Sequence, residues 1–384
     1  MTTSSPLLPP PIAVPGQDAG TVSTPALLVD LDAFEYNIDH MAALARHHGV
    51  KLRPHAKAHK SSAVAMAQLA QGATGICCQK LSEAYPFINA GVKDIFISNQ
   101  FVGDAKVAMA VELARHVKLS VCVDHPAQVE ALGKAADSAG VHITVLPEVD
   151  IGHGRCGVAD VESLLALADC IARYHSLRFG GIQAYHGGIQ HLADWEDRKQ
   201  AASRAAAMTL EFIQALESRG IACPTVTGGG TGTVEFDAAS GVYTEIQPGT
   251  YVFMDEHYGT NGWAGNLRLR QSLFIASTIM STCKPERVVC DVGLKGVAVD
   301  SGLPRVSQSG GGDRFRYIAA NDEHGILMTT QNESIDSRTD PLGERVLLIP
   351  GHCDPTCNLY AEFVGIRNGI VECVWKIDAR GLSQ

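Results

Sequence analysis

The residue with the clearest chemical potential is Lys57, within the stretch Arg53-Pro54-His55-Ala56-Lys57-Ala58-His59-Lys60. The stretch stands between a short apolar-leaning segment and a helix-like segment that begins at Ser61. In α/β folds, active sites are built where strands end and helices begin. A lysine beside other cations has a lowered pKa, and its neutral amine can form a Schiff base. A solvated basic loop would show the same spacing, so both interpretations stay open.

A second feature is the glycine run Gly228-Gly229-Gly230-Thr231-Gly232, which follows a predicted strand. Glycines let backbone N–H groups approach an anion closely, and Thr231 adds a hydroxyl. The run is not a nucleotide P-loop, because no Gly-Lys-Ser/Thr sequence follows it. Taken alone, the run is typical of a phosphate cradle or of a plain turn.

A third feature is the pair His352 and Asp354, which follows the apolar segment Arg345–Ile349. Residues two apart on an extended chain point the same way, which would allow joint metal ligation. One imidazole and one carboxylate, with water completing the shell, suit Mn²⁺ or Mg²⁺ better than a closed zinc site. Two such residues at this spacing also occur without any function.

Six motifs follow one another in an order that resembles the D-threonine aldolases and the related D-3-hydroxyaspartate aldolases. They are Arg53–Lys60, Gly75–Lys80, Gly154–Gly157, Gln183–Gly187, Gly228–Gly232 and Gly351–Thr356. The resemblance extends from about Thr24 to Gly381. These aldolases are pyridoxal-phosphate (PLP) enzymes of the alanine-racemase-like fold, also called fold type III. The resemblance therefore implies a (β/α)8 TIM-type barrel that carries PLP, followed by a mainly β C-terminal domain.

The resemblance also assigns cofactor contacts. Lys57 matches the Schiff-base lysine of the family. The other expected contacts are Gln79, Arg155, Tyr185, Gly229, Gly230, Thr231, Gln247, Gly249, Thr250 and Tyr258. Among them, the glycine run is expected at the phosphate, Arg155 at the phenolic oxygen of the ring, and Gln247 where related racemases place an arginine near the pyridine nitrogen. An exposed strand-end amide at Gln79 and a surface ion pair between Arg155 and Glu148 are the alternatives.

His191 is the candidate base for the hydroxyl of the substrate, since an unperturbed imidazole pKa of about 6.5 suits proton transfer near neutrality. A loop histidine without a role is the alternative. In the family, the residues matching His352 and Asp354 bind a divalent cation. The D-serine dehydratases of this fold carry a cysteine where Asp354 stands and favour zinc, and neither Cys353 nor Cys357 occupies that position. This contrast favours an aldolase.

The predicted reaction is cleavage of the Cα–Cβ bond of a D-β-hydroxy-α-amino acid, with D-threonine giving glycine and acetaldehyde. A divalent metal on His352 and Asp354 would lower the pKa of the β-hydroxyl. Three alternatives stay open: a D-3-hydroxyaspartate aldolase that releases glyoxylate, a D-serine or hydroxyaspartate dehydratase, and a non-catalytic PLP-binding protein. A metallohydrolase without PLP would leave Lys57 and the glycine run unexplained.

Strand-like and helix-like segments alternate up to about residue 268, at steps of roughly 25 residues, which predicts a parallel sheet and favours a (β/α)8 barrel. Nine strand candidates compete for eight positions, and Ala26–Leu31 is expected outside the barrel. Asp32 is expected to cap the helix that follows, whose apolar face ends at Gly49. The strand candidates are Ala26–Leu31, Lys51–Ala56, Gly75–Cys78, Asp94–Ser98, Leu119–Val123, Ile143–Glu148, Phe179–Tyr185, Thr225–Thr227 and Glu245–Gln247.

The chain is expected to divide into three parts: an extended arm over residues 1–23 that packs with the β domain, a PLP-binding barrel over 24–268, and a mainly β domain over 269–384 that carries the metal ligands. Asn368-Gly369 predicts a hairpin turn, and Ser334–Pro341 predicts a loop. In this fold the β domain of one subunit faces the barrel of another. The resemblance therefore implies a homodimer with a site that spans two chains.

Composition indicates which partners, disulfides and membrane segments to expect. The chain has 384 residues and a net charge of −10, which argues against a nucleic-acid or anionic-membrane partner. Eleven cysteines, two of them adjacent, show no disulfide spacing and indicate free thiols in a reducing cytoplasm. No apolar run reaches about 18 residues, so no membrane span is expected. The first residues lack the basic and apolar regions of a signal peptide.

Overall fold

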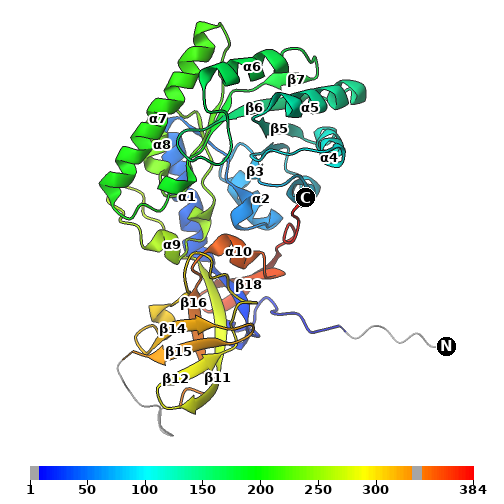
Figure 1. Ribbon diagram of the computed structural model, residues 1–384. Coiled ribbons are helices and arrows are strands. Elements are labelled where there is room, and N and C mark those ends of the chain that lie inside the picture. Colours follow the sequence, from blue (N-terminus) through cyan, green and yellow to red (C-terminus); the bar gives the residue numbers. More distant parts are fainter. Residues whose placement is uncertain (1–7, 331–339) are drawn as a thin grey trace, which may run out of the picture.

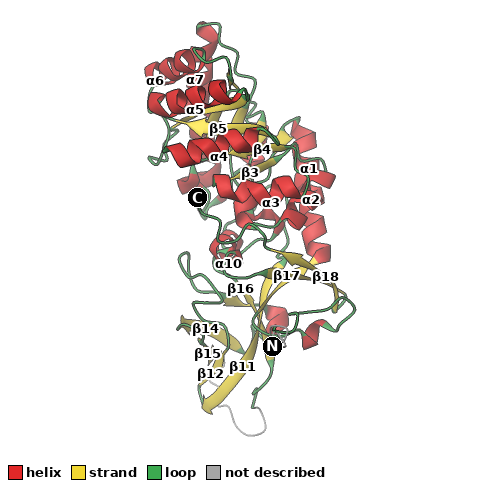
Figure 2. Cartoon of the chain, turned by 90° about the vertical axis from the view of Figure 1, so that its right-hand side faces the viewer, coloured by secondary structure: helices red, strands yellow, loops and turns green. Residues whose placement is uncertain are grey.

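The protein is built from two sheets, one in a helix-covered barrel and one in a β domain. This computed structural model describes residues 8–330 and 340–384. Figure 1 shows the barrel at one end of the molecule and the β domain at the other, and Figure 2 shows how the helices gather around the barrel. The predicted combination of a parallel barrel and a C-terminal mainly β domain is confirmed.

The barrel strands are parallel and lie in the order β2-β10-β9-β8-β6-β5-β4-β3. The two ends of this order meet through a parallel bridge between His55 and Cys77, and the N–H of Cys77 donates to the carbonyl of Pro54 at 2.9 Å. Their bounds are β2 (Lys51–Leu52), β3 (Ile76–Cys78), β4 (Asp94–Ile97), β5 (Lys118–Val123), β6 (Ile143–Val149), β8 (Ile182–Ala184), β9 (Val226–Gly228) and β10 (Glu245–Ile246). These strands occupy the eight predicted positions, but several are shorter than predicted.

The predicted strand Phe179–Tyr185 is broken into β7 (Leu177–Phe179) and β8. The break lies at Gly180 and Gly181. Gly181 has a φ of 126°, and a Cβ there would lie 1.8 Å from the carbonyl oxygen of Thr225. Only glycine allows the chain to pass so close to its neighbour.

Helices cover the outside of the barrel. In α1 the residues Phe34, Ile38, Met41 and Ala45 form the buried face, as predicted. The cap is Asp30 and not the predicted Asp32, because the Asp30 carboxylate accepts from the N–H of Ala33 at 3.0 Å. The helices are α1 (Leu31–His48), α2 (Ser62–Ala70), α3 (Ala84–Asn89), α4 (Asp104–Ala114), α5 (Pro126–Ala139), α6 (Val161–Ile171), α7 (Trp195–Ser218), α8 (Val234–Ala239), α9 (Glu256–Gly259) and α10 (Cys353–Cys357).

The second sheet contains β1 (Ala26–Asp30), which pairs antiparallel with β11 and parallel with β17. This pairing confirms that the first strand lies outside the barrel. The predicted barrel range of 24–268 therefore includes one strand of the β domain. The other strands are β11 (Leu273–Lys284), β12 (Arg287–Cys290), β13 (Arg305–Val306), β14 (Phe315–Ala320), β15 (Gly325–Thr329), β16 (Arg345–Ile349), β17 (Glu362–Arg367) and β18 (Ile370–Lys376).

The described part of the N-terminal arm lies along β18. The N–H groups of Gly16 and Ala19 donate to the carbonyls of Val371 and Gly369, both at 2.8 Å. The hairpin between β17 and β18 turns at Asn368 and Gly369, with φ values of 50° and 77°, as the Asn-Gly pair predicted. Residues 1–7 of the arm and most of the predicted loop Ser334–Pro341 lie outside the described residues.

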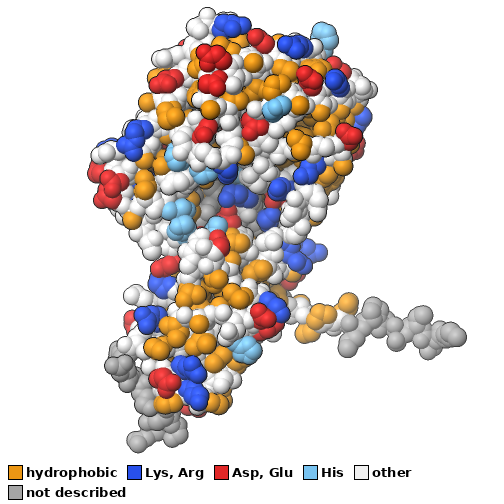
Figure 3. All heavy atoms as spheres, in the orientation of Figure 1, with side chains coloured by type: hydrophobic (Ala, Val, Ile, Leu, Met, Phe, Trp, Pro, Cys, Tyr) orange, Lys and Arg blue, Asp and Glu red, His pale blue; other side chains and the backbone are white. Residues whose placement is uncertain are grey.

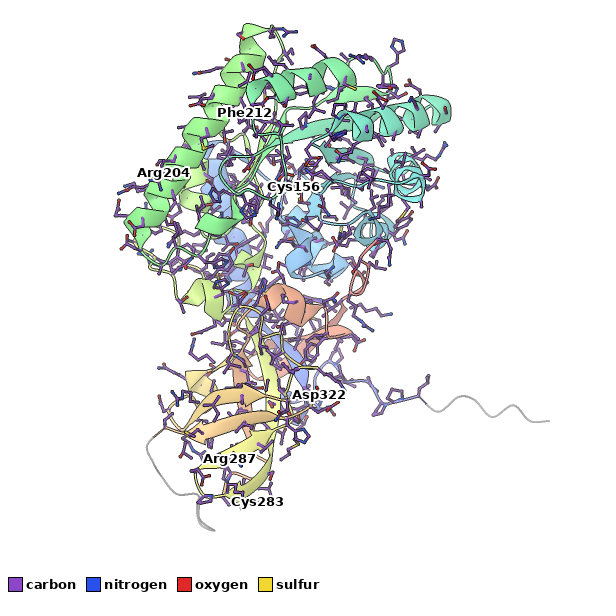
Figure 4. All side chains as sticks on the ribbon, in the orientation of Figure 1. Cys156, Arg204, Phe212, Cys283, Arg287 and Asp322 are labelled. Carbon is purple, nitrogen blue, oxygen red and sulfur yellow. The ribbon has the colours of Figure 1, made fainter. Side chains whose placement is uncertain are left out.

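All eleven cysteines are free thiols, as predicted. Figure 4 shows two of them far apart: Cys156 lies in the barrel, and Cys283 lies near the far end of the β domain. In residues 8–330 and 340–384, no helix combines the length and the apolarity that a membrane crossing requires.

One hydrophobic core continues from the barrel into the β domain. At the junction, the ring of Phe253 lies 6.4 Å from that of Phe34 on α1 and 5.1 Å from that of Phe363 on β17. The ring of Trp375 on β18 lies 5.4 Å from that of Phe34. Because aromatic side chains bury large apolar areas, this cluster holds the two domains in a defined arrangement.

We expect Phe253→Ala to destabilise the protein by about 3–5 kcal/mol, because it leaves a cavity at the domain junction. The measurement is the urea midpoint of unfolding of the mutant and of the parent chain. Met208→Ala, which truncates a side chain that is 39% exposed on α7, is the control and should leave the midpoint nearly unchanged. Equal midpoints for Phe253→Ala and the parent would contradict a shared core.

Candidate active site

The barrel contains a cavity of about 240 Å³ where its strands end. Active sites of such barrels lie at this end, because the loops after the parallel strands converge there. Every residue predicted to contact the cofactor lines this cavity: Lys57, Gln79, Arg155, Tyr185, Gly229, Gly230, Thr231, Gln247, Gly249, Thr250 and Tyr258. The structure thus brings together residues that are spread over some 200 positions of the sequence.

Lys57 lies in a short 3₁₀ turn, Ala56–Ala58, just after β2. Its Nζ donates to Oδ2 of Asp354 at 2.7 Å, so a lysine of the barrel pairs with a carboxylate of the β domain. The charge of Asp354 raises the pKa of Lys57 above its usual value. The predicted lowering of this pKa is therefore wrong for the lysine without cofactor.

The neighbours of Lys57 are also less cationic than the sequence suggests. Burial lowers the pKa values of His55 and His59 to about 3, so both imidazoles are neutral at neutral pH. Lys60 pairs with Glu83 at 2.5 Å. The sequence could not reveal these partners, because they come from other strands and helices.

Three cavity residues were absent from the sequence prediction: His55, Ser98 and Gln183. His55 Nε2 lies 3.0 Å from Oε1 of Gln79 and 3.1 Å from Oγ of Ser98. Ser98 directly follows β4, so the rule that strand ends carry site residues could have identified it. Gln183 belongs to β8 itself, inside a motif that was noticed for Tyr185.

The glycine run has the properties of an anion cradle. The N–H groups of Thr231 and Gly249 donate no hydrogen bond to the part of the chain that the structure describes. A Cβ at Gly228 would lie 1.8 Å from the carbonyl oxygen of Ala184, and one at Gly232 would lie 2.0 Å from the carbonyl oxygen of Gln190. Gly229 has a φ of 73°, which favours glycine. Free backbone donors in a loop that tolerates only glycine fit the phosphate of PLP better than a plain turn.

The structure is compatible with both predicted interpretations of Arg155. Its Nη2 lies 3.7 Å from Oε1 of Glu148, which is the ion pair expected as the alternative. The same guanidinium lies 5.5 Å from the centre of the Tyr185 ring and lines the cavity. Arg155 therefore contributes a positive charge to the cavity wall, and Glu148 pairs with the same guanidinium.

Hydrogen bonds to neighbouring side chains hold the amide of Gln247 in place at the cavity wall. Its Nε2 donates to Oε1 of Gln183 at 2.8 Å and to Oγ1 of Thr227 at 2.7 Å. The Sγ of Cys77 lies 3.6 Å from its Oε1. The side chain is 4% exposed and carries no charge. A ring nitrogen bound here would meet a neutral amide, whereas an arginine would add a charge.

His191 does not line the main cavity and lies beside it in a stack of aromatic rings. Its ring lies flat on that of His257, with centres 3.4 Å apart and an angle of 2° between the planes, and 4.3 Å from the ring of Tyr258. Burial lowers the pKa of His191 to about 4, below the expected 6.5. The neutral imidazole can accept a proton at neutral pH. His257 was not predicted, and nothing in its local sequence marks it.

The predicted extended geometry of His352 and Asp354 is wrong, because Asp354 lies in the first turn of α10 and His352 precedes that helix. Their side chains still converge, with His352 Nε2 4.0 Å from Asp354 Oδ2. Asp300 Oδ2 lies 2.8 Å from His352 Nδ1, as expected for a residue that orients a metal ligand. Burial opposes ionisation of Asp354, yet the charges of Lys57 and His352 outweigh it and hold its pKa well below the usual range.

These two side chains fit a metal ion that keeps several water ligands. Two donors that each lie about 2 Å from one ion are separated by roughly 3–4 Å. Within residues 8–330 and 340–384, no cluster of three or more His, Cys, Asp or Glu side chains could hold a metal. A closed protein cage, such as structural zinc requires, is therefore not formed by the described residues.

A second subunit is not needed to bring the predicted metal pair to Lys57. Lys57 and Asp354 meet within one chain. An open groove of about 390 Å³ leads outward from this pair, and its lining includes Lys60, Lys80 and His352. Figure 3 shows lysine, arginine and histidine side chains gathered on this face around a hollow between the two domains.

Comparisons with known proteins agree with this geometry. Residues 29–257 match the family described as alanine racemase, N-terminal domain, and residues 272–366 match a serine dehydratase domain. The chain is 48% identical to a D-threonine aldolase of Arthrobacter sp over 98% of this chain and 97% of the relative. It is 42% identical to a 3-hydroxy-D-aspartate aldolase of Paracoccus denitrificans over 96% and 95%, respectively. The crystal structure of D-threonine aldolase from Filomicrobium marinum superimposes with a TM-score of 0.91 at 41% identity, covering 96% of this chain and 98% of the other.

Asp237, behind the glycine run, should make stability depend on pH. Burial raises its pKa to about 7, so the folded protein holds this proton more tightly than the unfolded chain, whose aspartates titrate at about 4. The Asp237 contribution is present at low pH and is lost as the pH rises from about 4 through about 7, by at most about 1.4 kcal/mol per pH unit.

The measurement is the urea midpoint of the cofactor-free parent and of Asp237→Asn at several pH values from 5 to 8, a range chosen around the pKa of about 7. The mutant should gain stability relative to the parent as the pH rises. The amide oxygen can still accept the hydrogen bond from Thr233. Parallel curves for the two proteins would contradict a raised pKa.

Proposed function

Because this chain belongs to the family of D-threonine and 3-hydroxy-D-aspartate aldolases, we propose that it cleaves D-β-hydroxy-α-amino acids between Cα and Cβ, with D-threonine giving glycine and acetaldehyde. The family belongs to the carbon–carbon lyases and shares the PLP-dependent alanine-racemase-like fold. The observation that carries the proposal is the contact between Lys57 Nζ and Asp354 Oδ2. In this contact one residue of the predicted metal pair, Asp354, lies beside the predicted cofactor lysine, which supports the proposal.

Lys57 would hold PLP covalently, and the backbone of Gly229, Gly230 and Thr231 would hold its phosphate. When bound, PLP supplies an electron sink for the charge that bond cleavage leaves on Cα. Arg155 and Tyr185 would flank the ring, because they line the cavity wall next to each other. Gln247 would offer the ring nitrogen a neutral partner.

His352 and Asp354 would hold Mn²⁺ or Mg²⁺, which lowers the pKa of a hydroxyl bound to it. His191 would remove the proton from the β-hydroxyl, since its imidazole is neutral at neutral pH and its buried Nδ1 has no hydrogen-bond partner within the described chain. His257 would keep the plane of that imidazole fixed by stacking on it.

A second candidate substrate is D-3-hydroxyaspartate, which would release glyoxylate. The outward groove supports it, because Lys80 lines this groove and forms no ion pair with any described residue. A free cation there could receive the additional carboxylate. The homodimer and the cytoplasmic location remain predictions, and the metal pair supplies no argument for the dimer.

Product analysis tests the reaction. Purified protein with D-threonine should give glycine and acetaldehyde, and Lys57→Ala should lose both the bound yellow cofactor and all activity. We expect His191→Ala to keep the cofactor and to lower kcat by about 10²–10⁴-fold, as for loss of a general base. Formation of 2-oxobutyrate and ammonia would instead establish a dehydratase. Relative kcat/KM for D-threonine and D-3-hydroxyaspartate decides the preferred substrate.

Removal of the metal should abolish activity. We expect EDTA to inactivate the enzyme without releasing PLP, and added Mn²⁺ or Mg²⁺ to restore it. His352→Ala should raise the metal concentration needed for half-maximal activity, because it removes one of the two predicted metal ligands. His324→Ala, which removes an exposed imidazole of the β domain, is the control. Full activity after exhaustive chelation would refute the metal role.

A further inference from the structure

Arg198 is a fully buried cation that none of the proposed roles uses. It lies in the first turns of α7 and is 0% exposed. No ion pair between described residues includes it. Burial lowers its pKa, as expected for a cation without a carboxylate partner. A buried charge destabilises the folded state unless its donors are satisfied, so hydrogen bonds must compensate for the burial of this guanidinium.

The guanidinium donates only to backbone carbonyls, and they belong to three different loops. Nε donates to Gly232 at 2.9 Å, and Nη2 donates to Gly262 at 2.6 Å. Nη1 donates to Leu192 and, at 3.4 Å, to Ala193. The indole rings of Trp195 and Trp263 lie 5.4 Å from the guanidinium carbon, so cation–π attraction adds to these bonds.

Each of these loops carries a residue of the candidate site. Gly232 ends the glycine run that contains Thr231. Leu192 and Ala193 directly follow His191. Gly262 lies shortly after Tyr258, whose ring packs against that of His191 at 4.3 Å.

Gln190 adds hydrogen bonds between the same loops that Arg198 connects. Its Oε1 accepts from the N–H of Gly232 at 3.0 Å, and its carbonyl accepts from Nδ2 of Asn261 at 2.9 Å. The glycine run, the His191 loop and the segment after α9 thus form one hydrogen-bonded unit with Arg198 inside it.

We infer that Arg198 is a positioning residue that fixes the loop of His191 relative to the phosphate cradle. The inference rests on the proposed function, since it uses the roles assigned to Thr231 and His191. The guanidinium carries its donors on three nitrogens spread over a plane and so reaches three loops, whereas the three N–H groups of a lysine ammonium all leave one nitrogen. Loss of Arg198 should therefore weaken cofactor binding and slow catalysis together.

The test compares Arg198→Ala and Arg198→Lys with two reference variants, Thr231→Ala and His191→Ala. The readouts are the Kd for PLP, measured on cofactor-free protein, and kcat at saturating cofactor, both per folded molecule. Thr231→Ala should change mainly Kd, and His191→Ala mainly kcat. Arg198→Ala should change both by about tenfold or more, as for lost hydrogen bonds to a charged group, and Arg198→Lys should lie between Arg198→Ala and the parent.

Added guanidinium ion should restore part of both quantities in Arg198→Ala, because it can refill the space with the same donors. Arg204→Ala is the matched control, since Arg204 is exposed on the same helix (Figure 4) and should change neither readout. If Arg198→Ala does not fold, Arg198→Lys supplies the same two readouts.

A lowered unfolding midpoint with unchanged Kd and kcat in both Arg198 variants would overturn the inference and leave a purely structural role. Failure of the proposed function is a separate result: Thr231→Ala and His191→Ala would then leave PLP binding and turnover unchanged.

Discussion

The candidate site depends on one charged contact between the two domains. Lys57 and Asp354 are 297 residues apart in the chain and meet at 2.7 Å. The Lys57 side chain is 43% exposed and that of Asp354 is 12% exposed, so the pair alone contributes little to stability. It forms because the barrel and the β domain are packed in one arrangement. Each charge also sets the ionisation of the other: Asp354 raises the pKa of Lys57, and Lys57 helps to keep Asp354 ionised.

The arrangement is maintained by apolar and polar contacts around the junction. The aromatic rings of Phe34, Phe253 and Phe363 form a shared core below the contact. Closer to the site, the buried carboxylate of Asp255 accepts from the N–H of Tyr258 and from that of Cys353, both at 2.9 Å. This carboxylate joins α9, which bears the stack on His191, to α10, which bears Asp354. The junction therefore fixes the metal pair against the cofactor cavity.

Behind the residues that face the cavity lies a layer of buried polar side chains. Gln190 and Arg198 connect the loops above the glycine run, and Asp237 accepts a hydrogen bond from Thr233 beneath it. Such groups are tolerated in the interior only when hydrogen-bonded, so they hold their loops in one conformation. None of them stands out in the sequence, because a buried glutamine or arginine is recognised only by its neighbours.

The sequence by itself predicted the fold class and the approximate strand positions, and its resemblance to the aldolases predicted eleven cofactor contacts, all of which line the cavity. The fold brings these residues together because residues that follow parallel strands converge at one end of a barrel, whatever their separation along the chain. Only the tertiary structure decided the ionisation of Lys57, the stacking of His191 on His257, the helical geometry at Asp354 and the completion of the metal pair within one chain. These properties arise from burial and from contacts between distant segments, and a pKa or a ring orientation responds to both at distances of a few ångströms.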